Sequence, residues 1–313
     1  MTVPNPPSDS FLFQALMEST ADSIYFKDRE CRLLRVSRKM AQDLGFSDPA
    51  ELIGKTDIEL FGVEFGQGTR LDDLRIMDTN RPIVGVVESR RIDMARTNWT
   101  LTTKLPLHDE SGKVIGLVGI TREINEMRET EAALQHLATH DTLTDLPNRF
   151  LMIDRLTQLL SRAQRTGAVF AVLYMDLDHF KEVNDAHGHE LGDLLLRAVA
   201  GRLRKSVRQS DTVARMGGDE FVIVLEALHE MSDADVVGAN VLRAIARSFT
   251  LQKRKVKITA SIGISFFPDN GTDVDTLLRA ADYAMYLAKR QGGNGYVNCL
   301  PGQSTAEGAS PGN

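Results

Sequence analysis

The sequence predicts a protein of the mixed α/β (α+β) class, with two domains that a helix joins. Its 313 residues are enough for two domains of ordinary size. Short strand and helix patterns fill the first part of the chain, whereas longer amphipathic helices alternate with apolar strands in the C-terminal half. Between the two, residues 121–140 contain neither Gly nor Pro, which favours an uninterrupted helix.

Composition excludes several classes of protein. The net charge of −6 argues against nucleic acid as the main partner, although a small phosphorylated ligand needs only a local basic pocket. Cys31 and Cys299 show no metal or redox spacing, so a reducing, cytoplasmic setting is expected. We expect neither a signal peptide nor a membrane span. Residues 1–10 and 301–313 are rich in Pro, Gly and Ser and are expected to be disordered.

Residues 11–123 form the first predicted domain. Asp48-Pro49 is a typical helix start, and three strand patterns end the domain, the last two separated by a hairpin loop containing Gly112. In chain order, the expected elements are two short strands in SIYFKDRECRLLRVS, a short helix in RKMAQDLGF, a helix start with short turns in DPAELIGKTDIELF, and strands in IVGVVESRRI, WTLTTKLPLHD and KVIGLVGITREI.

This order of elements resembles a PAS sensor domain, an antiparallel sheet with short helices. The resemblance implies either a small ligand held between the sheet and the short helices or a role in dimerisation. Cys31 does not lie in the Asn-Cys-Arg motif of photoreactive flavin-binding PAS domains. His108 lies in the hairpin loop, a poor position for a haem ligand. We therefore predict no specific cofactor, and the sequence leaves the PAS ligand unknown.

Residues 124–139 are predicted to form a helical linker with a narrow apolar seam, which Glu131 interrupts. Two interpretations remain open. The helix packs on its own domain, or it forms a parallel coiled coil that joins two sensor domains to two output domains, making the protein a homodimer through the PAS domain and the linker. The seam consists of Ile124, Met127, Leu134 and Ala138.

Acids at the ends of two strand patterns are the main functional signal in the second domain, residues 140–300. Asp176 and Asp178 end the apolar run AVFAVLYMDLDHF, and Asp219 and Glu220 follow the Gly-Gly pair in ARMGGDEFVIV. A surface hairpin is one explanation, since Gly-Gly suits tight turns. The other is chemistry: if the strands are neighbours, the carboxylates cluster, and they tolerate one another best around Mg²⁺ shared with a triphosphate.

Four motifs of this domain resemble the GGDEF family of diguanylate cyclases: DTLTDLPNR, DLDHFKEVNDAHGHELGD, RMGGDEF and ADYAMYLAK. The resemblance implies a palm-like GGDEF domain, a mixed but mainly antiparallel sheet flanked by helices. It also implies a nucleotidyltransferase that condenses two GTP into cyclic di-GMP and releases two pyrophosphates. Because that product is two-fold symmetric, two GTP-loaded domains must face each other.

The resemblance also implies the site residues, with Mg²⁺ as the metal and Mn²⁺ as a substitute. A carboxylate at Asp193 can accept both adjacent donors of guanine, which adenine lacks. Asp178 is interpreted as a structural acceptor, and His187 and His189 as structural residues rather than a metal pair. The implied metal ligands are Asp176, the Leu177 carbonyl, Asp219 and Glu220; the catalytic residues are Asp219, Glu220 and Lys181; the GTP contacts are Asn184, Asp193, His179, Phe180, Lys181, Arg215 and Lys289.

Two features bear on regulation and activity. Arg208 and Asp211 match the family's inhibitory Arg-x-x-Asp motif, so cyclic di-GMP is expected to be both product and inhibitor, with a plain charged turn as the alternative. Gly293 stands where the family usually has arginine. This departure leaves open a weak or degenerate domain that binds GTP or cyclic di-GMP and signals through contacts. A cyclase that makes adenine-containing products is opposed by Asp193, and no phosphodiesterase domain is expected to follow.

Overall fold

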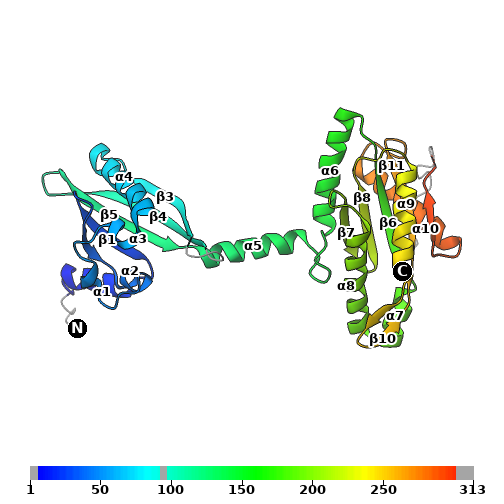
Figure 1. Cartoon of the computed structure of the whole chain (residues 1–313), viewed down its shortest axis with the longest axis horizontal. Helices are drawn as coiled ribbons and strands as arrows, with labels where there is room; N and C mark the ends of the chain where they lie inside the picture. The colour runs from blue at the N-terminus through cyan, green and yellow to red at the C-terminus, as the bar shows by residue number, and fades with distance from the viewer. Residues whose placement is uncertain (1–5, 92–96, 301–313) are drawn as a thin grey trace, which may run out of the picture. The chain divides into compact units, whose positions relative to one another are not determined.

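The computed structural model describes residues 6–91 and 97–300, and the chain divides into two compact units, Met1–Ala132 and Ala133–Asn313 (Figure 1). The predicted mixed α/β class, with an antiparallel first sheet and a helix-flanked second sheet, is confirmed. In the part of the chain that the structure describes, no helix is long and apolar enough to cross a membrane. Residues 301–313 and 1–5, predicted to be disordered, lie outside the described residues.

The first unit is built on a five-stranded antiparallel sheet in the order β2-β1-β5-β4-β3. Its apolar core lies between the sheet and the helices α2, α3 and α4. The strands are β1 (Ser23–Asp28), β2 (Leu33–Val36), β3 (Ile83–Arg91), β4 (Thr97–His108) and β5 (Val114–Glu123), and the helices are α1 (Asp9–Ser19), α2 (Arg38–Asp43), the 3-10 helix η1 (Pro49–Leu52), α3 (Asp57–Phe61) and α4 (Val63–Thr79).

Helices α1 and α4 are the elements of this unit that the sequence pattern did not predict. For α4 the reason is local. Its mean composition is polar, and Gly66 and Gly68 weaken the helical signal. Gly66 has a packing reason: a Cβ atom there would lie 2.5 Å from the Cα of Ile58, so only glycine lets α4 approach α3 this closely. Tertiary contact therefore keeps a residue that local propensity disfavours.

The N-terminal end is more ordered than predicted. Helix α1 begins at Asp9, because the Oγ of Ser8 caps it by accepting a hydrogen bond from the Phe11 backbone at 3.3 Å. The prediction of disorder up to residue 10 is therefore wrong at Asp9 and Ser10. The helix attaches to the sheet through Met17, which is buried, and through Phe13, whose ring lies edge-on to Phe26.

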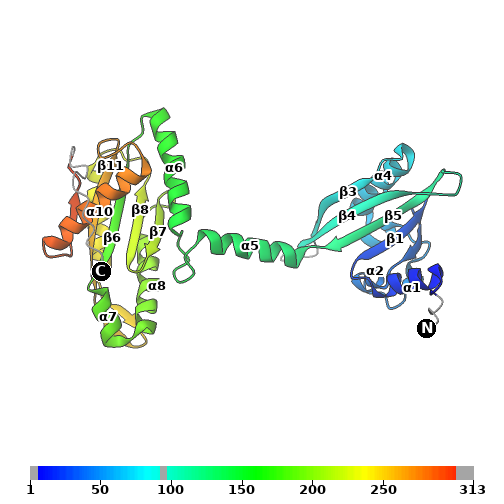
Figure 2. The ribbon, with the colours of Figure 1, turned by 180° about the vertical axis from the view of Figure 1, so that it is seen from behind.

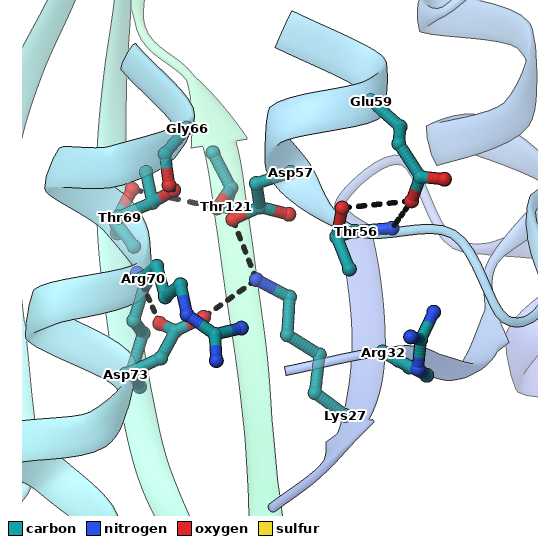
Figure 3. A network of polar contacts seen from close by, with 12 residues as sticks. Lys27, Arg32, Thr56, Asp57, Glu59, Gly66, Thr69, Arg70, Asp73 and Thr121 are labelled. Atoms are coloured by element: carbon teal, nitrogen blue, oxygen red, sulfur yellow. Dashed lines mark hydrogen bonds and ion pairs between the residues drawn. The ribbon is translucent and has the colours of Figure 1, made fainter. Parts of the chain in front are cut away.

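A buried ion network ties α3 and α4 to the sheet. The Nζ of Lys27, on β1, lies 2.6 Å from Asp57 of α3 and 2.6 Å from Asp73 of α4, as Figure 3 shows. The Nζ of Lys104, on β4, lies 2.6 Å from the other oxygen of Asp73. Burial lowers the pKa of Lys27, but the charges of Asp73 and Asp57 outweigh it, and the pKa is raised. The network contains two cations and two anions, so it is neutral.

The second unit is built on a five-stranded sheet in the order β12-β11-β6-β8-β7, antiparallel except where β12 joins β11. Helices α8 and α9 cover one face of it (Figure 1), and α6 and α10 cover the other (Figure 2). The elements are α5 (Asn125–Thr139), α6 (Arg149–Thr166), β6 (Phe170–Asp178), α7 (Phe180–His187), α8 (His189–Ser206), β7 (Thr212–Gly217), β8 (Glu220–Leu225), α9 (Ser232–Ile245), β9 (Phe249–Leu251), β10 (Arg254–Val256), β11 (Thr259–Phe267), α10 (Val274–Arg290) and β12 (Tyr296–Asn298).

Cover on both faces explains the continuous apolar run in β6. Leu173 and Met175 point to the α8–α9 core, while Val172 and Tyr174 point to the α6–α10 core. The sequence did not predict the two-stranded sheet β9–β10 or strand β12, because strands of three residues leave too little pattern.

Helix α5 forms where a helical linker is predicted, and it buries none of its residues. Met127 and Leu134, two members of the predicted seam, are exposed. Within the residues that the structure describes, α5 contacts the PAS unit through its first turn but buries no side chain there, so burial gives no support to packing on its own domain, one of the two interpretations. A coiled coil with a second copy stays a prediction.

Candidate active site

Strands β6 and β8 are antiparallel neighbours and bring the predicted acids together. Asp176 and Glu220 are direct partners in the register. Side chains alternate along a strand, so both face the same side as Tyr174, whose hydroxyl donates a hydrogen bond to Glu220 at 3.0 Å. The sequence predicted a carboxylate cluster if these two strands were neighbours, and the structure shows that they are.

Asp176 is an acid of this cluster whose pKa is shifted by its surroundings. It is buried, and its carboxylate pairs with the Nζ of Lys289, on α10, at 2.7 Å. Burial raises the pKa of Asp176 to about 6, a rise that Lys289 opposes and the charges of Asp219 and Glu220 reinforce. Acids therefore outnumber bases here, and the site favours the approach of a further cation.

Arg215 stabilises the turn between β7 and β8 by hydrogen bonds. Its Nε and Nη2 atoms donate to the carbonyl of Gly218 at 3.0 and 2.7 Å, and Nη1 contacts both oxygens of Asp141 at 2.9 and 3.0 Å. Gly217 and Gly218 have φ angles of 148° and 51°, which suit glycine. The contacts of Arg215 are thus with the protein itself, and its predicted GTP contact stays a prediction.

Asp141 links this turn to the segment that follows α5. Burial opposes its ionisation, but hydrogen bonds from Thr144 and Arg215 outweigh that effect and lower the pKa of Asp141. Sequence reasoning did not assign Asp141 a role, although it stands in the DTLTDLPNR motif. Asp141 and Arg215 bind each other, and Arg215 also binds the Gly218 carbonyl, so the pair fixes the position of this carbonyl next to Asp219.

Asp178 is a structural acceptor, as predicted. The hydroxyls of Thr259 and Ser261 donate to its carboxylate at 2.6 Å each, and the backbone of Asn294 donates at 2.9 Å. Gly293 lies against the same carboxylate with a φ of +71°, and a Cβ atom there would be 3.1 Å from it. The position where the family usually has arginine is therefore a left-handed turn in close contact with Asp178.

The predicted guanine residues Asn184 and Asp193 are on the neighbouring helices α7 and α8. The predicted phosphate residues lie in two places, since His179, Phe180 and Lys181 are at the beginning of α7 and Lys289 is on α10 beside Asp176. The Oδ1 atom of Asn184 is buried without a hydrogen-bond partner and lies where a Cβ atom on Gly192 would be, 1.9 Å away. Such an orphaned acceptor suits a donor on a ligand. Asp193 is the next residue of α8 and is exposed, as is Lys181 of α7, whereas Phe180 is buried in the core. His179 begins α7 with a φ of 61° and contacts Glu182 at 2.8 Å.

At the predicted inhibitory site for cyclic di-GMP, Asp211 is bound within a turn whereas the Arg208 side chain is exposed. Both oxygens of Asp211 accept backbone hydrogen bonds, from Arg208 at 2.9 Å and from Glu226 at 3.2 Å. This is what a structural turn between α8 and β7 requires. The Arg208 side chain is exposed. The inhibitory role of the pair stays a prediction.

Asp282 is a further acid of the site that the sequence analysis missed. It is on α10, two turns before Lys289 and so on the same side of the helix. Burial raises the pKa of Asp282, and the charge of Glu220 adds to the rise while Lys289 opposes it. The seven-residue spacing from Lys289 in the ADYAMYLAK motif is the signal that could have identified it.

Within the described residues, no three His, Cys, Asp or Glu side chains form a group that could hold a metal ion by themselves. The donors fit Mg²⁺ in another way. Mg²⁺ is usually bound by one or two carboxylates together with substrate phosphates, and the carboxylates of Asp176 and Glu220 are hard oxygen donors on paired residues. The donor set therefore suits an ion that arrives with a triphosphate.

Comparisons with known families define the class of the protein. Residues 17–129 match the PAS fold, and residues 138–295 match the GGDEF domain of diguanylate cyclases. The protein thus combines a PAS domain with a GGDEF domain. The second match covers about half of the chain, and the chain belongs to the GGDEF diguanylate cyclase family.

Individual relatives agree with this. The chain is 52% identical over 163 residues to MucR of Pseudomonas aeruginosa, a bifunctional diguanylate cyclase/cyclic di-GMP phosphodiesterase, a match that covers 52% of this chain and 24% of MucR. It is 40% identical over 166 residues to the diguanylate cyclase TpbB of the same species, covering 53% of this chain and 38% of TpbB. The chain therefore spans only about a quarter to two fifths of these relatives.

Solved structures resemble the second unit. The GGDEF domain of TpbB from Pseudomonas aeruginosa matches 51% of this chain and 94% of that chain, at 39% identity and a TM-score of 0.51. The coiled coil and GGDEF domain of DgcB from Caulobacter crescentus, solved with cyclic di-GMP, matches 56% of this chain and 93% of that chain, at 27% identity and a TM-score of 0.52.

Proposed function

We propose that this protein is a diguanylate cyclase that condenses two GTP into cyclic di-GMP with release of two pyrophosphates. The observation that carries the proposal is the pairing of Asp176 with Glu220 across β6 and β8, beneath the Gly217–Gly218 turn and beside Lys289. A cluster with more acids than bases, next to a glycine turn, provides both a metal site and room for a nucleotide.

The metal site consists of Asp176, the Leu177 carbonyl, Asp219 and Glu220. Bound Mg²⁺ supplies positive charge that neutralises the triphosphate. Asp219, in the turn, helps to orient and deprotonate the ribose 3′-hydroxyl that attacks the α-phosphate. Much of the catalytic effect comes from positioning and from charge neutralisation.

Recognition of GTP is divided between two regions. Asn184 and Asp193 bind the guanine edge, and the free Oδ1 of Asn184 supports this assignment because it needs a donor. Lys181 and Lys289, with the amides near His179 and Phe180, hold the phosphates. Lys289, which pairs with Asp176 at 2.7 Å, would be free to contact a phosphate if a metal ion neutralised that carboxylate.

Two active sites must face each other because each domain has one guanine site and the product has two guanines. A homodimer through the PAS domain and α5 supplies that arrangement, and the exposed seam of α5 supports it. The PAS domain regulates the rate, and cyclic di-GMP inhibits through Arg208 and Asp211. Arg208→Ala should therefore lose inhibition by added product while it keeps the initial rate.

The test is incubation of the purified chain with GTP and Mg²⁺, followed by mass spectrometry of the nucleotides and a pyrophosphate assay. Two pyrophosphates for each cyclic di-GMP are expected, and Mn²⁺ should substitute. A protein that binds GTP at the metal site without turnover would instead support the degenerate binding module that Gly293 leaves open. Asp193→Asn distinguishes guanine recognition, because an amide cannot accept both guanine donors and GTP-over-ATP preference should fall.

A further inference from the structure

The PAS unit contains a cavity of about 300 Å³ between its sheet and the helices α2, α3 and α4. This volume is at the lower end of the range for small-molecule sites. Strand β4 contributes Thr100 and Lys104 to the lining, β3 contributes Glu88, and β1 contributes Tyr25. The cavity can therefore hold a compact ligand that meets several polar groups at once.

The inner end of the cavity does not require an anion. Lys104, the most deeply buried cation of the lining, pairs with Asp73 at 2.6 Å, and the neighbouring Lys27 pairs with Asp73 and with Asp57, another lining residue (Figure 3). Charges in this network already balance. An added carboxylate or phosphate would have to compete with aspartates at hydrogen-bond distance, so an anionic ligand is disfavoured.

Glu88 is different. Its Oε2 accepts a hydrogen bond from Thr102 at 2.6 Å, and it pairs with no Lys, Arg or His among the residues that the structure describes. It is half-buried, and its register partner on β4 is Thr100, whose side chain also lines the cavity. A partly desolvated carboxylate whose contact is a neutral hydroxyl attracts a cation that can donate hydrogen bonds.

The wall opposite the sheet is apolar and aromatic. Phe61 of α3 and Phe65 of α4 lie edge to face with ring centroids 5.6 Å apart, and Met40 of α2 and Leu44, which follows α2, continue this wall. Aromatic rings suit the flat body of a small ligand and also attract cations. The cavity thus combines a carboxylate on one side with an apolar surface on the other.

We propose that this cavity binds a small organic amine, with its ammonium group paired to Glu88 and its apolar body against Phe61 and Phe65. The hydroxyls of Thr100 and Thr121 accept the remaining ammonium hydrogens. Neutral and anionic molecules of the same shape lack the group that Glu88 requires.

The site is connected to α5 at its open end. Asn98 and Glu123, which line the cavity, accept hydrogen bonds from the Nδ2 of Asn125 at 2.9 and 2.7 Å, and Asn125 is the first residue of α5. The backbone of Trp99 donates to the Oδ1 of Asn125 at 2.8 Å, and the guanidinium of Arg128 lies 4.1 Å from the Trp99 ring centroid. A ligand that moves these strands shifts the start of the linker helix; this coupling rests on the proposed cyclase function, whereas the binding site does not.

Three molecules of matched shape test the charge preference: phenethylamine, 2-phenylethanol and phenylacetate, each titrated calorimetrically into the full chain. We expect the amine to bind at least about tenfold more tightly than the alcohol, because its ammonium group can make a charge-assisted hydrogen bond to Glu88 that a neutral hydroxyl cannot. Phenylacetate should bind most weakly. Equal binding of amine and alcohol, tighter binding of phenylacetate, or no binding of any of the three at millimolar concentration would overturn the proposal.

The variant Glu88→Gln tests whether Glu88 is the residue that causes the preference for the amine. The amide oxygen still accepts the hydrogen bond from Thr102, so the fold is retained, and thermal unfolding checks this. Amine affinity should fall about tenfold, to the level of the alcohol. Glu110→Gln, at an exposed acid in the β4–β5 loop, is the matched control and should leave all three affinities unchanged. Because binding is read without turnover, a chain that makes no cyclic di-GMP still tests the site; an unaltered preference in Glu88→Gln would rule it out.

Discussion

The two units of the molecule each contain a cluster of lysines and acids, and the clusters differ in their balance. In the PAS unit, Lys27 and Lys104 meet Asp57 and Asp73, and all four side chains are at most 9% exposed. In the GGDEF unit, Lys289 is the base that pairs with Asp176, and the charges of Asp219 and Glu220 act on the same carboxylate.

The balance of positive and negative charges distinguishes a structural cluster from a functional one. The PAS network joins two strands to two helices, and each charge in it already has a partner, so its role is to hold the fold. In the acidic cluster, burial raises the pKa of Asp176, and the negative charges of Asp219 and Glu220 add to the rise although Lys289 opposes it. A cluster with a perturbed pKa and unbalanced charge is typical of a functional site, which agrees with the metal and nucleotide site proposed here.

The largest expected effect is on turnover. Asp176→Asn removes a proposed metal ligand and should lower cyclic di-GMP production by about 10³-fold or more, which is typical for loss of a group that stabilises transition-state charge. Unlike most buried substitutions, it should not lower the free energy of unfolding measured without metal, because it removes a buried charge and the repulsion from Asp219 and Glu220. Asp269→Asn, at an exposed turn at the far end of β11, is the control. Turnover near the wild-type rate would remove Asp176 from the metal site.

The opposite pattern is expected for the PAS network. Asp73→Asn leaves Lys104 and Lys27 buried with one carboxylate between them, and should lower the free energy of unfolding of the PAS unit by about 3–5 kcal/mol. Chemical denaturation measures this, and Asp72→Asn on the same helix should change it little. If Asp73→Asn proves neutral, the network does not hold the fold, and the contrast between the clusters fails.

The next largest effect is expected on the pH dependence of the free energy of unfolding, which Asp176→Asn should change. Its folded pKa of about 6 lies above the ordinary value of 3.8, so the folded state binds the extra proton between these values. Stability from this group is therefore present at pH 4 and is lost as the pH rises through about 6. In metal-free buffer, Asp176→Asn should match the wild type near pH 4 and exceed its free energy of unfolding by about 1–3 kcal/mol at pH 7.5. A constant difference across this range would contradict the raised pKa.

A smaller effect is expected at Arg215, whose contacts resemble the PAS network more than the acidic cluster. Lysine keeps the charge but loses the fork that binds Asp141 and Gly218, so Arg215→Lys should lower kcat about tenfold with KM for GTP nearly unchanged. Arg243→Lys, exposed on α9, is the control. A rise in KM with kcat preserved would instead support the phosphate contact predicted from sequence.

The smallest effect is expected at Gly293. Its φ of +71° costs other residues about 1 kcal/mol, so Gly293→Ala should lower the free energy of unfolding by about that amount, and Gly293→Asn by less. Gly293→Arg, which restores the usual family residue, carries the same strain beside Asp178, so a gain in turnover is not expected despite the added charge. Equal stability of the Ala variant and the wild type would show that the turn adapts.

Sequence pattern predicted most of the long elements of both units and missed α1, the glycine-containing α4 and the strands of three residues. Strand β6 and helix α10 have strong periodic patterns, whereas α4 contains Gly66 and β12 has only three residues. The same division applies to the site. Asp176 and Glu220 stand in dense motifs, but Asp282 and Asp141 gain their roles from partners that are distant in the chain.

By itself, the sequence determined which acids, lysines and glycines are available and where the strands that carry them begin and end. It also indicated that the acidic cluster can form, because residue type and strand pattern are local properties of the chain, whereas the PAS network was not predicted, since Asp73 lies on the unpredicted helix α4. Only the tertiary structure decided how the charges are shared: that Lys104 meets Asp73, that Lys289 meets Asp176, and that Glu88 meets a hydroxyl. Pairing depends on which elements pack together, and the free energy of a buried charge depends on its neighbours, which no local pattern specifies.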